Sequence, residues 1–148
     1  MLYYRKATIE DIDLLCEIRK TQLIHEGLDP AVNIDDELQA FFKKSFEDNT
    51  MIEILAVEDE KIVATGAVIF YDYPPSYSNK TGMSAYITNM FTDPAYRGQG
   101  IATKILDMMV REVKSSGVTI IRLRASKFGM PVYKKYGFVE ESDWLCIK

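Results

Sequence analysis

The sequence predicts one α/β or α+β domain, and three observations support this. Strand-like and helix-like segments alternate in the order β-α-α-β-β-β-α-β-α-β. No linker, internal repeat or low-complexity tract separates them, so we expect a single domain over residues 1–148. Hydrophobic residues make up 47% of the chain and charged residues 27%, which is enough apolar material for a core.

The first half predicts a strand, two helices and a hairpin. A strand at 2–6 precedes Thr8 and Asp11, whose spacing is typical of a capping box, and the helix that follows should end near Gly27. The β-branched runs 51–57 and 61–71 flank a short polar turn, as in an antiparallel hairpin. The helical spacing of a second amphipathic helix is carried by Leu38, Phe41, Phe42, Ser45 and Phe46.

The second half predicts a central strand and a well-formed helix, followed by shorter elements. The run 83–92 is apolar on both faces, so it should be central in the sheet. The helix after Gly100 ends at Gly117, and its buried face is formed by Ile101, Ile105, Met109 and Val113. We then expect a strand within 118–126, a short helix within 127–137, and one or two strands within 138–148.

Charge and cysteine content narrow the function classes. A net charge of -4 and a pI near 5.1 argue against nucleic-acid binding through a broad cationic surface. Cys16 and Cys146 follow no metal-binding spacing and suit a reducing compartment, so we expect a cytoplasmic protein without a metal. No apolar run reaches the length of about 18 residues that a membrane span needs.

Glycines directly precede the predicted helix that starts near residue 101. The first amides of a helix lack intrahelical partners and carry the positive end of the helix dipole, so they can hold phosphate oxygens. Gly98 and Gly100 leave the approach to those amides open, and Arg97 or Lys104 could add positive charge. The pattern therefore predicts a pyrophosphate site.

Spacing separates the known phosphate-binding motifs. A P-loop requires Gly-Lys-Ser/Thr at the helix start, whereas this chain has Gly100-Ile101-Ala102-Thr103. A dinucleotide fingerprint requires a third small residue where Thr103 stands, and an acidic residue about 20 positions later. Neither motif fits well.

A third motif fits better. The segment 97–102, Arg-Gly-Gln-Gly-Ile-Ala, resembles the Arg/Gln-x-x-Gly-x-Gly/Ala motif of the GNAT N-acetyltransferase superfamily, and 132–138 resembles its later Tyr-x-x-x-Gly-Phe segment. The element order is similar along the whole chain. The resemblance implies a mixed, mostly antiparallel central sheet flanked by helices, with a splayed parallel strand pair. It also implies acetyl-CoA as cosubstrate, a primary amine of a small molecule or peptide as acceptor, and a homodimer in many members.

The resemblance assigns roles to particular residues. Tyr133 stands at the family's tyrosine position and is the candidate general acid or thiol-orienting group. An asparagine common in relatives is absent, and Ser126 or Lys127 could replace its contact. The implied cofactor-binding residues, mostly through their main chain, are Met90, Phe91, Thr92, Arg97, Gly98, Gln99, Gly100, Ile101, Ala102, Thr103 and Ser126.

The general base is not evident, because the central strand lacks the glutamate of many relatives. Asn89 could orient a water or the acceptor, or be a satisfied core amide; His25, Glu26 and Asp72 are alternatives. Without a base, the chain could instead be a non-catalytic acyl-CoA sensor, and a different acyl group is a further alternative. An aromatic wall for a cationic acceptor could be formed by Tyr71, Tyr73 and Tyr77.

Overall fold

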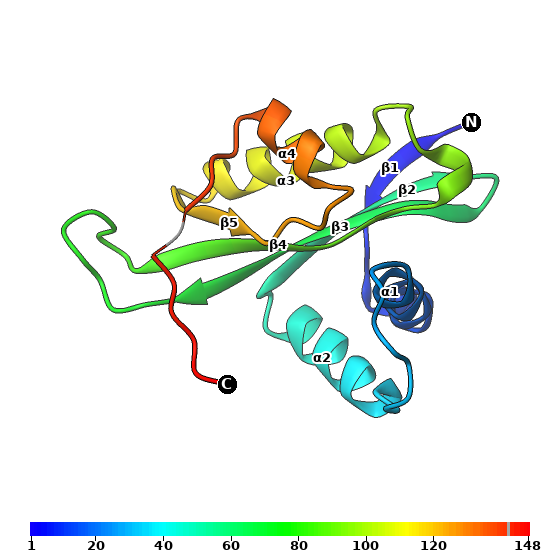
Figure 1. The fold of residues 1–148 in the computed structure, drawn as a ribbon, viewed down its shortest axis with the longest axis horizontal. Helices are drawn as coiled ribbons and strands as arrows, with labels where there is room; N and C mark the ends of the chain where they lie inside the picture. Colours follow the sequence, from blue (N-terminus) through cyan, green and yellow to red (C-terminus); the bar gives the residue numbers. More distant parts are fainter. Residues whose placement is uncertain (142) are drawn as a thin grey trace.

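The computed structural model describes residues 1–141 and 143–148, and its centre is one five-stranded sheet (Figure 1). The strand order is β1-β2-β3-β4-β5; the first three pairings are antiparallel, and β4 pairs with β5 in parallel. The strands are β1 (Tyr3–Lys6), β2 (Met51–Glu58), β3 (Lys61–Asp72), β4 (Met83–Thr92) and β5 (Ile121–Leu123). The helices are η1 (Ile9–Asp11), α1 (Ile12–His25), α2 (Asp35–Glu47), η2 (Pro94–Tyr96), α3 (Ile101–Ser115) and α4 (Met130–Tyr136). This is the mixed fold that the resemblance implies.

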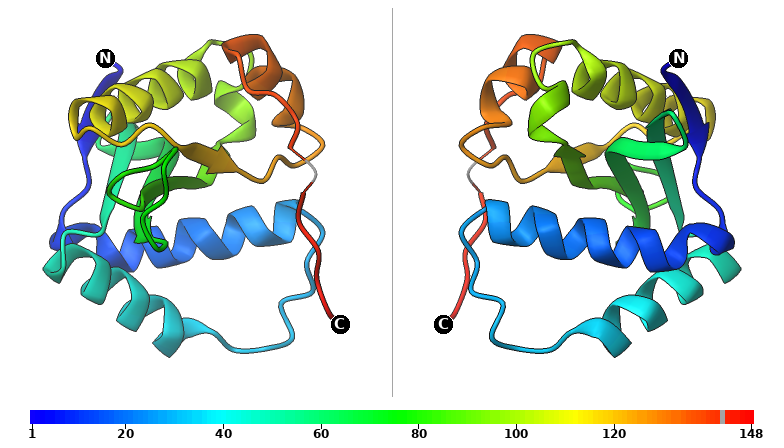
Figure 2. Two further views of the ribbon diagram at one scale, coloured as in Figure 1. Left: turned by 90° about the vertical axis from the view of Figure 1, so that its left-hand side faces the viewer. Right: turned by 90° about the vertical axis from the view of Figure 1, so that its right-hand side faces the viewer.

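Helices cover both faces of the sheet. Helices α3 and α4 lie on one face, and α1 and α2 lie on the other (Figures 1 and 2). On the α3 face the core includes Ile54, Val68, Ile105 and Met109. On the α1 face it includes Leu15, Phe42 and Leu55. A polar side chain buried in either of these apolar layers therefore needs a hydrogen-bond partner.

Local sequence chemistry explains the element boundaries. The Thr8 amide donates to Asp11 Oδ2 at 2.7 Å, as a capping box requires, and Arg5 holds the same carboxylate through two bonds of 2.8 Å. This pairing with Arg5 lowers the pKa of Asp11. In the β2–β3 hairpin, Asp59 and Glu60 both have positive φ, which gives the primed turn that matches strand twist.

A β-bulge interrupts β4 next to the predicted site. Thr65 pairs with Phe91 and Ala67 with Thr88, so Asn89 and Met90 both face Gly66. Asn89 adopts a φ of 55°, a left-handed conformation that asparagine tolerates better than most residues. A Cβ on Gly66 would lie 2.6 Å from Met90 Sδ, so only glycine fits opposite the bulge.

Strands β4 and β5 separate just before the bulge. Their pairing runs from Ala85–Ile121 to Ile87–Leu123 and stops there, while β4 continues to Thr92. The backbone of β4 from residue 88 onward therefore has no partner strand on its β5 side among the described residues. This is the splayed parallel pair that the resemblance implies.

The prediction of one or two strands after α4 is wrong for the part of 138–148 that the structure describes. The predicted strand within 118–126 is also shorter, reduced to three residues. The tail contacts β5 through side chains: Arg122 Nε donates to Glu141 Oε1 at 2.7 Å, and its guanidinium lies 5.7 Å from the Trp144 ring centroid. These contacts form no backbone ladder, and Leu145 and Ile147 are almost fully exposed.

Candidate active site

The turn before α3 presents a row of free amides. Gly98 and Gly100 have φ of 77° and 79°, the left-handed region that favours glycine. Lys104 N–H donates to Gly100 O at 3.0 Å, so the helical ladder begins only there. Within the described residues, the N–H groups of 98–103 donate to no partner, and they stand at the positive end of a 15-residue helix.

A cavity of about 520 Å³, here called the turn cavity, opens beside these amides. No side chain caps the start of α3, and a Cβ at Gly98 or Gly100 would meet nothing within 4 Å, so the approach is open. Of the predicted cofactor-binding residues, those that line the cavity are Met90, Phe91, Thr92, Arg97, Gly98, Gly100, Ile101, Ala102, Thr103 and Ser126. Gln99 does not line it, and neither do Asn89, Lys104 or Lys127.

Two polar side chains of the wall are held by backbone contacts. Arg97 Nε donates to Thr92 O at 3.1 Å, which links the glycine turn to the end of β4. Ser126 Oγ accepts from Gly129 N–H at 3.2 Å and so orders the start of α4. Ser126 thus has a structural contact as well as a place at the cavity.

Tyr133 lies between the turn cavity and a second cavity. The side chain is buried, and its hydroxyl makes no hydrogen bond to the described part of the chain. Burial, together with the nearby charge of Glu26, raises the pKa of Tyr133 to about 12. Gly129 packs on the ring, because a Cβ there would lie 2.7 Å from Tyr133 Cε2. The phenol is therefore neutral at pH 7, fixed in place and free to donate.

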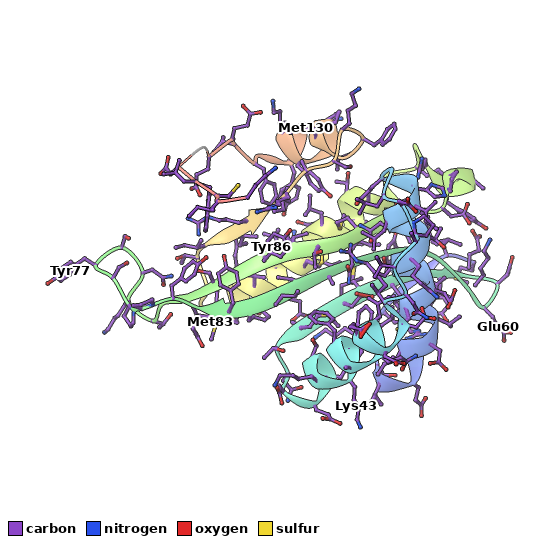
Figure 3. The ribbon with its side chains drawn as sticks, turned by 60° about the horizontal axis from the view of Figure 1, so that its bottom comes forward. Lys43, Glu60, Tyr77, Met83, Tyr86 and Met130 are labelled. Atoms are coloured by element: carbon purple, nitrogen blue, oxygen red, sulfur yellow. The ribbon has the colours of Figure 1, made fainter. Side chains whose placement is uncertain are left out.

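The second cavity, about 1130 Å³ and here called the β5 cavity, lies between β4, β5, α4 and the tail. Tyr71 and Tyr73 both line it, with ring centroids 5.2 Å apart in an edge-to-face pair. Tyr86 of β4 also lines this cavity, whereas Tyr77 stands fully exposed at the tip of the loop beyond β3 and β4 (Figure 3). Two of the three tyrosines of the predicted aromatic wall are thus together, and the third is elsewhere.

The end of α1 forms another wall of the turn cavity. The His25 ring packs edge-to-face on Phe91 at 5.5 Å between centroids. Gln22 donates to Glu26 Oε1 at 3.2 Å and accepts from Arg19 at 3.3 Å. His25 and Glu26 therefore lie beside the predicted cofactor strand, whereas Asp72 lines neither cavity.

Asn89 is a satisfied buried amide, and its partner is a residue that sequence reasoning missed. Asn89 Nδ2 donates to Glu53 Oε1 at 3.1 Å, and Thr65 Oγ1 donates to Asn89 O at 2.8 Å. Glu53 is 2% exposed, and burial raises its pKa to about 7. The sequence feature that could have revealed Glu53 is a glutamate at the third position of the otherwise apolar strand 51–57.

Comparison with known proteins identifies the fold and its chemistry. The family model of the acetyltransferase (GNAT) domain matches residues 28–146. The chain belongs to the GNAT acetyltransferase family. The GNAT relatives include bovine (Bos taurus) thialysine N-epsilon-acetyltransferase, 28% identical over 97% of this chain and 89% of that protein, and the pig (Sus scrofa) protein of the same name, 28% identical over 81% and 75%.

Solved structures of similar proteins have the same fold as this chain. A predicted acetyltransferase from Clostridium acetobutylicum, solved with acetyl-CoA, is 50% identical, with a TM-score of 0.97 over 100% of this chain and 96% of that one. A GCN5-related N-acetyltransferase from Ralstonia eutropha JMP134 has a TM-score of 0.91 at 20% identity over 100% and 99%, a likeness of fold alone. The chain is accordingly an N-acetyltransferase.

Two features of the described residues concern metals and membranes. No group of three or more His, Cys, Asp or Glu side chains in this part of the chain is arranged to bind a metal ion. None of its helices is long and apolar enough to cross a membrane.

Proposed function

We propose that this protein, as a single GNAT domain over residues 1–148, transfers an acetyl group directly from acetyl-CoA to a primary amine of a small molecule or peptide. The observation that carries the proposal is the row of free amides at the start of α3, which opens on a cavity that also contains the Tyr133 phenol. The similar Clostridium acetobutylicum structure with acetyl-CoA supports this cosubstrate.

The cofactor would bind mainly to main-chain groups. The amides of 98–103 would donate hydrogen bonds to the pyrophosphate oxygens, with Arg97 adding charge nearby. The unpaired edge of β4 at Met90, Phe91 and Thr92 would pair with the pantetheine arm, as a further strand would. Ser126 lines the same cavity and would contact the arm from the other wall.

Acyl transfer needs a neutral amine, and a proton for the departing thiolate. The amine nitrogen attacks the thioester carbonyl carbon, the C–S bond breaks, and the sulfur takes a proton from the Tyr133 hydroxyl. The phenolate then recovers a proton from the amide nitrogen being formed. Because the pKa of Tyr133 is about 12, the phenol carries its proton before each turnover.

The acceptor is proposed to be cationic at neutral pH. Glu26 lines the turn cavity and is exposed to solvent, so its carboxylate would attract an ammonium group. The names of the mammalian relatives, thialysine N-epsilon-acetyltransferases, support a terminal primary amine. The aromatic wall would be Tyr71 and Tyr73 at the β5 cavity.

Calorimetry with acetyl-CoA is the first test, followed by a thiol-release assay over a panel of amines and peptides. We expect binding and turnover with at least one primary amine. Absence of binding at millimolar acetyl-CoA would overturn the proposal. Binding without turnover on any acceptor would favour an acyl-CoA sensor, and a series of longer thioesters would reveal a different acyl group.

A homodimer in the cytoplasm is also proposed. The tail exposes Trp144, Leu145 and Ile147, and Trp144 lies on Arg122 of the edge strand β5, so the tail and this edge are proposed to contact a second copy of the chain. Cys16 and Cys146 are both free thiols, as in a reducing compartment. Light scattering should give a dimer for the full chain and a monomer after deletion of 143–148; a monomeric full chain would contradict the proposal.

A further inference from the structure

Glu53 is a carboxyl group in an apolar layer. On β2 it lies two residues from both Met51 and Leu55, which belong to the core against α1 and α2, so its side chain faces the same layer. The Glu53 carboxylate forms no ion pair with any described residue. The hydrogen bond from Asn89 Nδ2 is the only side-chain hydrogen bond that Glu53 makes within the described residues. A buried carboxylate without a cationic partner destabilises the fold, and such groups are concentrated at functional sites.

Its position is directly behind the wall of the turn cavity. Asn89 holds the carboxylate and is followed by Met90, which lines the cavity. On the α1 side, Arg19 acts electrostatically on Glu53 and donates to Gln22, which also lines the cavity. A single residue, Asn89 on one side and Arg19 on the other, thus connects Glu53 to a residue that lines the turn cavity.

The bulge creates this arrangement. Met90 packs toward α3, beside Gly66 and Ile105, and the left-handed Asn89 places its amide on the opposite face with Glu53. Thr65 fixes the bulge by donating to Asn89 O. The Asn89–Glu53 hydrogen bond therefore lies next to the stretch of β4 proposed to pair with the pantetheine arm.

We propose that Glu53 is the proton acceptor of the reaction, acting through water, and that Asn89 positions its carboxylate. This inference rests on the proposed function. The acceptor ammonium gives one N–H proton to a water in the cavity. Glu53 itself lines neither cavity, so the proton reaches its carboxylate through a further water between the cavity and Asn89, leaving a neutral amine and a neutral carboxyl group. After transfer, Glu53 releases this proton to solvent, which matches the one proton that acetylation of an ammonium group liberates.

The charged groups around Glu53 suit this task. Burial raises its pKa to about 7, while Asn89 and Arg19 lower it and Asp11 of η1 raises it. A base is most effective when its pKa is near the working pH. His25 and Glu26 also line the cavity, but His25 is packed on Phe91, and Glu26 is exposed and held by Gln22.

The test is the pH dependence of kcat/KM for Glu53→Gln, with the amine that gives the highest rate in the acceptor panel. The wild-type protein should gain activity as pH rises through about 7. Glu53→Gln should lose on the order of 100-fold at pH 7 and recover above pH 9, where a lysine-like amine increasingly loses its own proton. Its affinity for acetyl-CoA should be unchanged.

Glu58→Gln is the matched control, because Glu58 lies on the same strand at its far end and should leave the profile unchanged. A uniform loss at all pH values in Glu53→Gln would indicate a structural role and overturn the inference, as would full activity at pH 7. If His25→Asn or Glu26→Gln abolished the transition near pH 7 instead, that residue would be the base. Failure of wild-type protein to bind acetyl-CoA would refute the proposed function itself, a separate result.

Discussion

The two faces of the sheet hold the candidate site by different means. On the α3 face the groups are the main-chain amides of residues 98–103, and two glycines leave the approach to them open. On the α1 face they are side chains, with Glu53 held by Asn89, and Gln22 held between Arg19 and Glu26. The α3 face is open to an anion, whereas on the α1 face the Glu53 carboxyl group is buried.

This difference matches two separate tasks. A diphosphate is recognised by several donors at once, and backbone amides at a helix start provide them without side-chain ordering. Proton transfer requires a group whose pKa is moved toward neutrality, and burial of a carboxylate does this. Substitutions on the α3 face should therefore change affinity, and substitutions on the α1 face should change pH dependence.

Gly100→Val should have the largest effect and would test the α3 face. Valine at a φ of 79° strains the turn, and its side chain would occupy the open approach to the amides. Loss of about two charge-assisted hydrogen bonds predicts weaker acetyl-CoA binding, on the order of 1000-fold by calorimetry.

Gly117→Val is the matched control for that strain. Gly117 follows the other end of α3 with a φ of 86° and similar open space, so it should lose comparable stability without losing affinity. Equal affinities for the two variants would mean that the diphosphate binds elsewhere.

Glu53→Gln should raise the free energy of unfolding at alkaline pH, and it tests whether the α1 face contains a buried carboxyl group that titrates. Since folding raises the pKa of Glu53 from 4.5 to about 7, the native state binds more protons between these values, and stability falls as pH rises through that window. The Glu53→Gln variant has no such titrating group. The amount by which its free energy of unfolding exceeds that of the wild type should therefore grow from near zero below pH 4.5 to about 3 kcal/mol above pH 7. Urea unfolding at several pH values measures it, and a difference independent of pH would contradict a buried titrating carboxylate.

Tyr133→Phe should lower kcat by 10- to 1000-fold as an order-of-magnitude range, with little change in acetyl-CoA affinity. The ring and its packing remain, and only the proposed proton donor is removed. Tyr136→Phe is the control, because that hydroxyl donates to Asp107 on α3, outside both cavities, at 3.0 Å. An unchanged kcat in Tyr133→Phe would remove the phenol from the chemistry.

The α3 face was predictable because its information is local. The glycines, the helix start and the end of β4 all lie within residues 90–103, and the motif names the amides without any knowledge of packing. The capping box at Thr8 and the helix stop at Gly117 were predictable for the same reason.

The α1 face could not be predicted in this way. Glu53 and Asn89 are 36 residues apart and meet only because a bulge turns Asn89 toward that layer, and no local pattern states this. Tyr77 seemed equivalent to Tyr71 and Tyr73 by composition, but the loop carries it away from both cavities. The one or two strands expected within 138–148 do not form in the described part of that segment, because a segment forms a strand only where a neighbouring strand pairs with it, and local sequence does not show this.

Gly129→Ala should have the smallest effect and would connect the two faces through Tyr133. The new Cβ would lie 2.7 Å from Tyr133 Cε2, so the ring must shift by several tenths of an ångström. We expect about 10-fold lower kcat from misplacement of the donor hydroxyl. The same substitution in a Tyr133→Phe background should add almost nothing, because the donor is already gone. Equal losses in both backgrounds would show that Gly129 acts on the fold of α4 rather than on the phenol.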